Sequence, residues 1–514
     1  MMVVSNEDLL LGIDIGTQGV KGAIVSLDGK VIAEASVEQS CKYPRAGWVE
    51  HDMNQNWWQN PCLVIRKMLS QSGVNPGRIK AVFPSGLHPN FGPTDENGKP
   101  VYGAILYSDN RAITELNEIN QRYGLKLTSE ELTPKLVWFL RREKEAASRM
   151  KRFFDAAQYF VYKLCGEYVT DTISVGGWGA IYHSPTMQWK EERCEQLGID
   201  LKLLPRVVPP LSIVGEVHSQ AAQETGLSKG TPVAAGTNDV TTSTISGGAT
   251  KTSEAMAYYG TAGLLPVMKI DMDIALRQPY PYEERGGKPQ DGYLFDYPAY
   301  CLTTGDSLRW FRDEFGYEQR LIEAQTGISA YAQFDQIAEN APPGCEGLTF
   351  LPHMLGQRSP NFKPYASGAF LGLRRSHTRS HILRSLLEAW GYTIRFGLET
   401  YYPDGHPLKR LIATGGGARS KLWRQIVTDI TGIPQEYAPY AEGAVADAYL
   451  AGMAIGYFSD FSVLLNRWLS PGEMVFPQPE HCEAYEEGYA RFIKAHEIME
   501  PLYCLVTKFH QGKE

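Results

Sequence analysis

Residues 9–29 read LLLGIDIGTQGVKGAIVSLDG. This stretch begins with an apolar run that carries one carboxylate, Asp14, continues through the turn Gly16-Thr17-Gln18-Gly19, and ends with a second alternating run. Two strands joined by a short glycine-rich turn form a β-hairpin, in which backbone N–H groups and the Thr17 hydroxyl can face a small anion. The sequence therefore predicts a phosphate site with a carboxylate beside it.

The glycine spacing of this hairpin also resembles a dinucleotide-binding turn. In that fold the glycines open a helix, whereas here Val20, Ala23 and Ile24 continue as a strand. The chain contains no G-x-x-x-x-G-K-[ST] sequence, which excludes a P-loop enzyme. Glycine-rich turns are weak signals. From this segment alone, an ordinary buried hairpin with Asp14 at a strand end is an alternative to the phosphate site.

Length and composition indicate a soluble protein of several domains. The 514 residues are too many for one hydrophobic core and predict about two or three domain-sized units. A net charge of -8 without any basic run argues against a nucleic-acid partner, and no apolar run is long enough to cross a membrane. The eight cysteines show no C-x-x-C and no histidine at metal-binding spacing, which favours reduced thiols in a cytoplasmic protein.

Polar residues follow two of the expected strands. His88 lies in a breaker-rich loop after the strand at 79–83, and Tyr107 and Asp109 lie at the end of the strand at 104–107. Polar residues at the ends of neighbouring strands mark the mouth of an α/β sheet, so these three are candidate pocket residues. Their interpretation as ordinary loop polar residues stays open.

The run Glu50-His51-Asp52 offers two carboxylates and an imidazole in a row. Adjacent loop residues seldom converge on one ion, so a metal site here is the less favoured interpretation. We expect the run to fix the loop that precedes a helix beginning near Asn54.

Asp239 has the position of a catalytic base. It lies between an apolar strand at 231–235 and a helix of small residues at 240–247. A carboxylate at such a junction is held rigidly, and the helix dipole is expected to keep it ionised.

The second half of the chain begins as the first does. A strand at 255–259, the turn Gly260-Thr261-Ala262-Gly263 and a strand at 264–267 repeat the hairpin pattern. Two hairpins with Gly-Thr turns indicate a duplicated architecture with two phosphate loops facing one cleft. We therefore expect two domains, at 1–248 and 249–514.

The glycine-rich turns of this second half favour a nucleotide site. Gly305 lies in a turn that opens a helix, and the triplet Gly415-Gly416-Gly417 follows the strand at 411–414. Glycine lets a flat ligand approach the backbone closely, and Ser420 opens the next helix. A triple glycine is as often an ordinary turn, so its specificity is moderate.

With these motifs assembled, the chain resembles the FGGY family of carbohydrate kinases over nearly its whole length. The motifs that carry the match are Gly12-Ile13-Asp14-Ile15-Gly16-Thr17, Gly260-Thr261 and the segments 47–52, 135–138, 236–239, 368–373, 381–388 and 415–420. The resemblance implies an α/β fold of two actin-like (ribonuclease H-like) domains with a ligand cleft between them. The N-terminal domain would bind the sugar and carry the base, and the C-terminal domain would bind the nucleotide.

The resemblance also implies ATP-dependent phosphorylation of a small sugar or polyol in the cytoplasm, with Mg²⁺; a homodimer stays open. Asp239 would be the general base and would lie with Asp14 at the magnesium. The acceptor would be contacted by His88, Tyr107, Asp109 and Asp239. The nucleotide and its phosphates would be bound by Gly16, Thr17, Lys21, Gly260, Thr261, Gly305, Gly416, Gly417 and Ser420.

Within the family the chain looks most like the xylulokinase branch, which makes a ketopentose such as xylulose the first expected acceptor. That branch has Ser-Gly-Gln-Met-His-Gly where this chain has Ser85-Gly86-Leu87-His88-Pro89-Asn90, and it usually has Asn where this chain has Val240. Ribulose, a deoxyketose, glycerol and erythritol therefore stay open as acceptors. An ATP-binding actin-fold sensor without catalysis is the alternative from another class, and Asp239 argues against it, because a pure binder has no use for a base.

Overall fold

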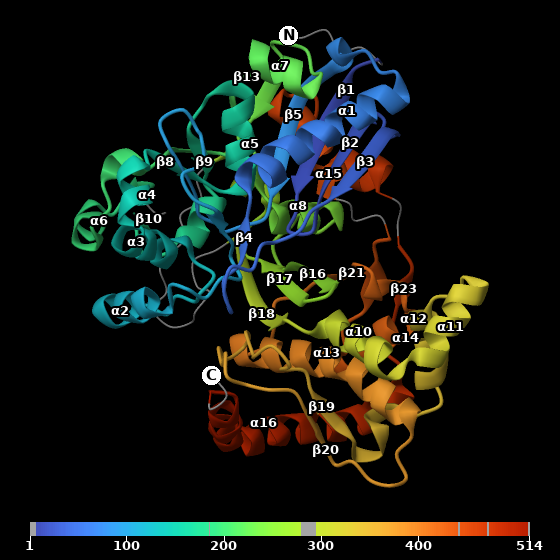
Figure 1. The fold of residues 1–514 in the computed structure, drawn as a ribbon. Helices are drawn as coiled ribbons and strands as arrows, with labels where there is room; N and C mark the ends of the chain where they lie inside the picture. Colours follow the sequence, from blue (N-terminus) through green and yellow to red (C-terminus); the bar gives the residue numbers. More distant parts are fainter. Residues whose placement is uncertain (1–6, 184–185, 279–293, 440–442, 470–471, 512–514) are drawn as a thin grey trace. The chain divides into compact units, whose positions relative to one another are not determined.

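The computed structural model describes residues 7–183, 186–278, 294–439, 443–469 and 472–511. The chain forms two compact units (Figure 1). The first contains Met1–Thr250, Ile270–Leu294 and Glu442–Ser470, and the second contains Lys251–Lys269, Phe295–Ala441 and Pro471–Glu514. The first unit therefore includes two segments from the second half of the chain.

The predicted hairpin lies at the centre of the first sheet. In sheet order the strands are β13 (Ile213–Glu216), β14 (Pro232–Ala234), β5 (Ile79–Gly86), β1 (Leu9–Ile15), β2 (Gly19–Ser26) and β3 (Val31–Glu38), and β15 (Thr237–Asn238) also pairs with β5. β1 is antiparallel to β2, with Asp14 opposite Lys21, and parallel to β5. Because residues 19–26 continue the sheet as a strand, the dinucleotide-binding interpretation is excluded.

The second sheet repeats the topology of the first. Its strands in order are β18 (Phe295–Cys301), β17 (Gly263–Met268), β16 (Glu254–Tyr259), β21 (Arg410–Thr414), β22 (Gln435–Tyr437) and β23 (Met474–Val475). β16 is antiparallel to β17, and β17 is antiparallel to β18. On the other side of β16, the pairings to β21 and from β21 to β22 are parallel, and the last pairing, from β22 to β23, is antiparallel. The first sheet has the same succession of pairings, which confirms the duplication that the two Gly-Thr turns predicted.

Helices surround both sheets. The first unit includes α1 (Asn60–Ser72), α2 (Ile113–Tyr123), α3 (Leu132–Arg142), α4 (Lys144–Arg149), α5 (Ala156–Cys165), α6 (Glu191–Leu197), α7 (Ser219–Thr225), α8 (Asp239–Ser246), α9 (Met272–Arg277) and α15 (Gly443–Ala454). The second includes α10 (Thr304–Phe315), α11 (Tyr317–Thr326), α12 (Ala330–Ala338), α13 (Arg379–Tyr401), α14 (Lys421–Thr431) and α16 (Cys482–Gln511). No helix in the described part of the chain has the length and apolarity that a membrane crossing requires.

Short strands lie outside the two main sheets. They include β4 (Glu50–His51), β6 (Gly92–Thr94), β7 (Ala104–Ile105), β8 (Arg152–Phe154), β9 (Val169–Asp171), β10 (Tyr182–His183), β11 (Gln188–Trp189), β12 (Arg206–Val208), β19 (Thr349–Leu351) and β20 (Ala369–Leu371). Three of them, β7, β8 and β9, precede polar residues of the candidate site.

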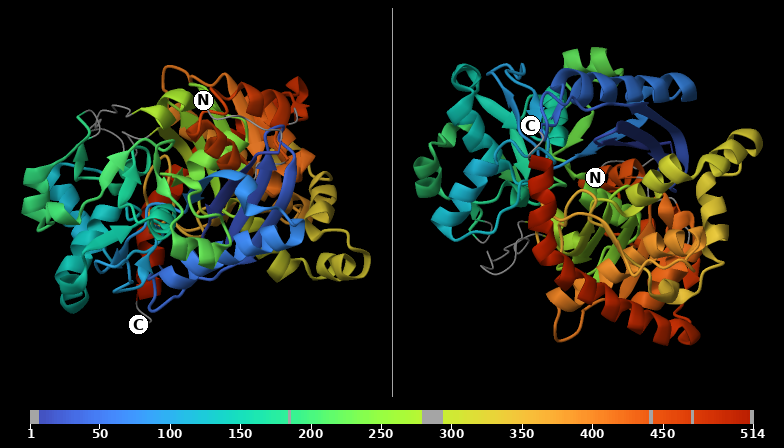
Figure 2. Two further views of the ribbon diagram at one scale, coloured as in Figure 1. Left: turned by 90° about the horizontal axis from the view of Figure 1, so that it is seen from above. Right: turned by 60° about the horizontal axis from the view of Figure 1, so that its bottom comes forward.

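The two faces of β1 contact different helices. Side chains alternate along a strand, so Leu11 and Ile13 lie in the core with residues of α1, whereas Leu10, Gly12 and Asp14 share the opposite face. On that opposite face α15 packs against β1, β2 and β5 (Figure 2). A Cβ atom on Gly12 would lie 2.0 Å from the carbonyl oxygen of Ala444, so the absent side chain permits the close approach of α15.

We expect the substitution Gly12→Ala to destabilise the first unit. The new methyl group would meet the backbone of α15, and overpacking of this kind costs about 1–3 kcal/mol. Urea unfolding measures the change. Gly77→Ala is the control, because Gly77 is exposed and its Cβ would meet only the tips of the Asn75 and Ser228 side chains. Equal unfolding midpoints for the two variants would contradict the close packing of α15 on β1.

Candidate active site

Three carboxylates gather at the carboxyl ends of the parallel strands of the first unit. Asp14 is near the end of β1, Asp239 is the first residue of α8 directly after β15, and Asp447 projects from α15. The strand register aligns Asp14 with Ser85 of β5, and Ser85 with Thr237 of β15. The Ser85 hydroxyl donates a hydrogen bond of 2.7 Å to Oδ2 of Asp447.

Asp239 is half-buried, and its carboxyl group titrates far above the usual range. Burial and, to a lesser extent, the negative charge of Asp14 raise the pKa of Asp239 to about 7, although His88 acts in the opposite direction. The expectation that the helix dipole keeps Asp239 fully ionised is wrong, because burial and Asp14 outweigh the dipole. A carboxyl group with a pKa near neutrality can both accept and release a proton at pH 7.

Asp447 is a member of this cluster that sequence reasoning missed. Its side chain is fully buried, and burial together with the charge of Asp14 raises its pKa well above the usual range. Its helix, residues 443–454, is otherwise composed of apolar residues, glycine and one tyrosine. The sequence signal was the single carboxylate in this apolar helix. Burying an acid without a partner is costly, so an acid at such a position indicates a functional site.

The first Gly-Thr turn is closed by a backbone hydrogen bond and anchored by His51. The Gly16 N–H donates to the carbonyl oxygen of Gly19 at 2.9 Å, which closes the turn. Nδ1 of His51 accepts a hydrogen bond of 3.2 Å from the Trp57 indole, so the ring hydrogen is left on Nε2, which lies 3.1 Å from the Thr17 carbonyl oxygen. Burial lowers the pKa of His51 to about 4, which keeps the ring neutral.

The run Glu50-His51-Asp52 therefore fixes the loop, as its sequence led us to expect. Glu50 pairs with Arg111, Asp52 pairs with Lys42, and His51 binds the turn. Because the three side chains have three different partners, they do not form one ligand set. The described residues contain no group of three or more His, Cys, Asp or Glu side chains that could hold a metal ion.

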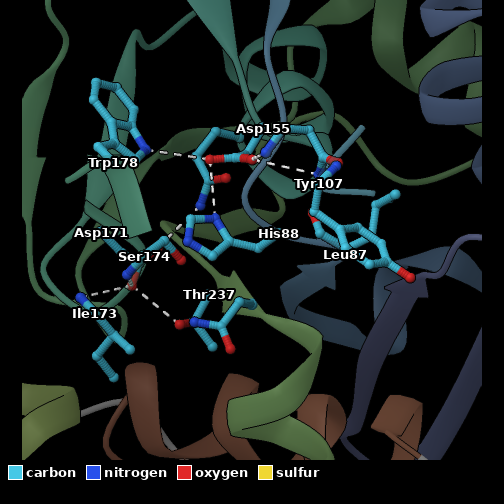
Figure 3. Close-up of polar contacts among 12 residues, drawn as sticks. Leu87, His88, Tyr107, Asp155, Asp171, Ile173, Ser174, Trp178 and Thr237 are labelled. Atoms are coloured by element: carbon cyan, nitrogen blue, oxygen red, sulfur yellow. Dashed lines mark hydrogen bonds and ion pairs between the residues drawn. The ribbon is translucent and has the colours of Figure 1, made fainter. Parts of the chain in front are cut away.

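His88 is held by a carboxylate in a buried network (Figure 3). Its Nδ1 lies 3.1 Å from Oδ2 of Asp155, which also accepts a hydrogen bond of 3.3 Å from the Trp178 indole. Burial by itself would lower the pKa of His88, but the carboxylates of Asp155, Asp171 and Asp239 outweigh it and raise the pKa. His88 is therefore the charged partner of Asp155 over a wider pH range than a free histidine would be.

Asp171 links this network to the strand that precedes Asp239. It accepts hydrogen bonds from the backbone N–H groups of Ile173 and Ser174 and from the Thr237 hydroxyl, each 3.0 Å long (Figure 3). Sequence reasoning missed both Asp155 and Asp171. Each stands at the end of a short strand, β8 or β9, which is the signal that singled out Asp239.

Tyr107 joins the same network, but Asp109 does not. The backbone N–H of Tyr107 donates to Oδ1 of Asn90 at 3.1 Å, and burial raises the pKa of the Tyr107 hydroxyl to about 12. Asp109 is buried and forms an ion pair of 2.7 Å with Arg111, whose guanidinium lies 3.9 Å from the centre of the Trp48 ring. Contact between Asp109 and an acceptor stays a prediction.

The second unit contains a cavity of about 620 Å³ that brings six predicted nucleotide residues together. They are Gly260, Thr261, Gly305, Gly416, Gly417 and Ser420. The N–H of Gly305 donates to the carbonyl oxygen of Gly260 at 2.9 Å, which fastens the start of α10 to the second Gly-Thr turn. A Cβ atom on Gly305 would lie 2.5 Å from that oxygen, so this contact requires glycine. The volume is that of a small-molecule site.

Comparison with known proteins identifies the family. Residues 9–246 match the N-terminal domain of the FGGY family of carbohydrate kinases, and residues 256–455 match its C-terminal domain. The chain belongs to the FGGY family. This membership confirms the resemblance, the enzyme class and the two-domain actin-like α/β fold predicted from the sequence, and FGGY kinases use ATP.

The FGGY relatives carry more than one substrate name. A gluconokinase of Bacillus licheniformis is 28% identical over 531 residues, which cover 98% of each chain. A xylulose kinase of Bacillus subtilis is 24% identical and covers 93% of this chain and 94% of its own. The crystal structure of xylulose kinase from Rhodospirillum rubrum has a TM-score of 0.82, at 27% identity over 96% of this chain and 99% of that one. Similar identities to differently named kinases do not separate the acceptors.

We expect Asp155→Asn to lower the pKa of His88. The substitution keeps the shape of the side chain but removes the nearest negative charge, so burial would then dominate. NMR titration of the imidazole measures the change. Asp171→Asn is the matched control and should lower the pKa less, because Asp171 acts on His88 only through space. An unchanged pKa in Asp155→Asn would contradict the pairing of His88 with Asp155.

Proposed function

We propose that this FGGY kinase transfers the terminal phosphoryl group of ATP to a hydroxyl group of a ketopentose, with xylulose as the first candidate. The observation that carries the proposal is Asp239, a half-buried carboxylate whose pKa is raised to about 7 beside Asp14 and His88. Such a group is suited to remove a proton from an alcohol at neutral pH.

Asp239 acts as the general base. As the acceptor oxygen forms its bond to the γ-phosphorus and the bond to the leaving ADP oxygen breaks, the hydroxyl proton passes to Asp239. Phosphoryl transfer requires little covalent participation by the protein, so positioning and charge neutralisation dominate catalysis. The hydrogen bond of 2.9 Å from the Val240 N–H to Oδ1 of Asp239 helps to hold the carboxylate in place.

The carboxylates of the first unit fit a magnesium ion that arrives with the nucleotide. Mg²⁺ in such enzymes is bound by one or two carboxylates together with substrate phosphates and water. Asp14 and Asp239 are near enough for the charge of one to raise the pKa of the other, so they would hold the ion. When bound, the ion would neutralise charge on the phosphate oxygens. Thr17 and Lys21 would provide a hydroxyl donor and an ammonium donor beside the ion, and Gly16 would shape the turn that carries Thr17.

The charges of the first unit favour an uncharged acceptor over an aldonate such as gluconate. His88 is paired with Asp155, Arg111 is paired with Asp109 and Glu50, and Nζ of Lys135 donates to three backbone carbonyl oxygens. The carboxylate of an aldonate would therefore lie near acidic side chains, and the neighbouring basic side chains already have partners within the protein. Hydroxyl groups of a ketose can instead donate to those carboxylates.

Ribulose, a deoxyketose, glycerol and erythritol remain the alternative acceptors within the same chemistry. The sequence also left open an ATP-binding sensor without catalysis, but membership of a carbohydrate kinase family argues against that class. Asp239 distinguishes the two classes, since a sensor gains nothing from a carboxyl group with a pKa near 7.

We expect Asp239→Asn to abolish acceptor-stimulated ATP consumption while leaving nucleotide binding intact. Loss of a general base lowers turnover by about 10²- to 10⁴-fold. ADP release is measured against ketopentoses, gluconate, hexoses, glycerol and erythritol. Asp200→Asn, at an exposed position of the first unit, is the control and should keep full activity. Strongest stimulation by gluconate would contradict the ketopentose assignment, and near-normal turnover in Asp239→Asn would remove Asp239 from the mechanism.

We expect turnover to fall as the pH is lowered through about 7. The base must be unprotonated to accept a proton, and burial raises the pKa of Asp239 to about 7, so activity is full above that pH and decreases below it. The pH profile of kcat/KM, which reports the pKa values of the free enzyme, measures this limb. An acidic limb shifted down to the range of an ordinary carboxyl group would show that Asp239 is not the titrating base.

A further inference from the structure

The nucleotide cavity of the second unit contains one acid that the proposed function does not use. Asp335, on α12, lines this cavity and is half-buried. Among the described residues that line the cavity it is the only acidic one, whereas Arg309 and Arg419 are basic. ATP is a polyanion, so a carboxylate in its site must contact a part of the ligand other than the phosphates.

Asp335 is held by the residue that begins α14. The Ser420 hydroxyl oxygen caps that helix by accepting a hydrogen bond of 2.9 Å from the Trp423 N–H, and the Ser420 hydroxyl proton is left for Asp335. Burial raises the pKa of Asp335 to about 6, so the group is ionised at pH 7.5 and can only accept hydrogen bonds. Ser420 lies just after Gly416 and Gly417 in the cavity lining, so Asp335 is tied to the glycine wall against which a flat base would lie.

The other walls of the cavity suit a purine ring. They include the side chains of Tyr331, Phe334, Leu383, Leu387 and Trp423. Apolar side chains and a bare glycine backbone bind a flat aromatic ring, but they do not distinguish one purine from another. A carboxylate does, because adenine has an amino group at position 6 where guanine and hypoxanthine have an oxygen.

We propose that Asp335 selects the purine by accepting a hydrogen bond from the 6-amino group of ATP and by rejecting 6-oxopurine nucleotides. The proposal rests on the proposed assignment of this cavity to ATP. A 6-oxopurine would place its oxygen against the carboxylate and leave that acceptor without a donor, which a binding site penalises strongly.

The test measures the binding of ATP and of ITP by calorimetry. No acceptor is present, so the measurement does not depend on turnover. We expect wild-type protein to bind ATP about 10- to 100-fold more tightly than ITP, the range for one hydrogen bond to a charged group. Asp335→Asn and Asp335→Ala should each reduce this preference to within about threefold of parity. Glu339→Gln is the matched control. Glu339 is an exposed acid at the C-terminal end of α12, four residues after Asp335, and it does not line the cavity. It should keep the wild-type preference.

The outcomes separate the two proposals. An unchanged ATP preference in both folded variants would overturn the role of Asp335. An equal loss of ATP and ITP affinity, absent when 2′-deoxy-ATP is the ligand, would place the carboxylate at the ribose and overturn selection of the base. Failure of wild-type protein to bind ATP would overturn both proposals. ATP preference without acceptor-stimulated turnover would support Asp335 and count against the kinase proposal.

Discussion

The contact between β1 and α15 is the constraint on which the first unit and its acidic cluster depend. Without a side chain at Gly12, the helix reaches the strand backbone, and the alternation of β1 then presents Asp14 to the same helix one step further along. Asp447 comes from the helix and Asp239 from the start of α8. The packing therefore confines acidic groups in one buried region, and burial together with the charge of Asp14 raises the pKa values of Asp239 and Asp447.

A hydrogen bond holds the first Gly-Thr turn without placing a charge beside it. Burial keeps His51 neutral, and the Trp57 indole donates to its Nδ1, so Nε2 carries the hydrogen and anchors the Thr17 carbonyl oxygen. His88 has the opposite environment, since Asp155 favours its protonated form. The pKa values of two buried histidines of one unit thus shift in opposite directions, since Nδ1 of His51 faces an indole donor and Nδ1 of His88 faces a carboxylate.

The sequence predicted those features of the fold and of the candidate site that depend only on residues close together in the chain. Both hairpins, the strand before Asp239 and the glycine turns that line the cavity of the second unit each follow from residues adjacent in the chain. Asp447 could not be placed in the same way, because the pattern of its helix does not say which strand that helix covers. Asp155 and Asp171 follow strands of only three residues, which are too short to recognise by alternation. The dipole argument predicted the wrong direction for the pKa shift of Asp239, because burial and the charge of Asp14 arise from tertiary packing that the local sequence does not show.

The order of the segments along the chain affects how the protein can form during synthesis. α15 belongs to the first unit but is encoded after most of the second. Until the ribosome has passed residue 454, the Leu10-Gly12-Asp14 face of β1 lacks its covering helix. The nascent first unit therefore presents an uncovered sheet face to chaperones, and a fragment ending near residue 250 would keep that face exposed and tend to aggregate.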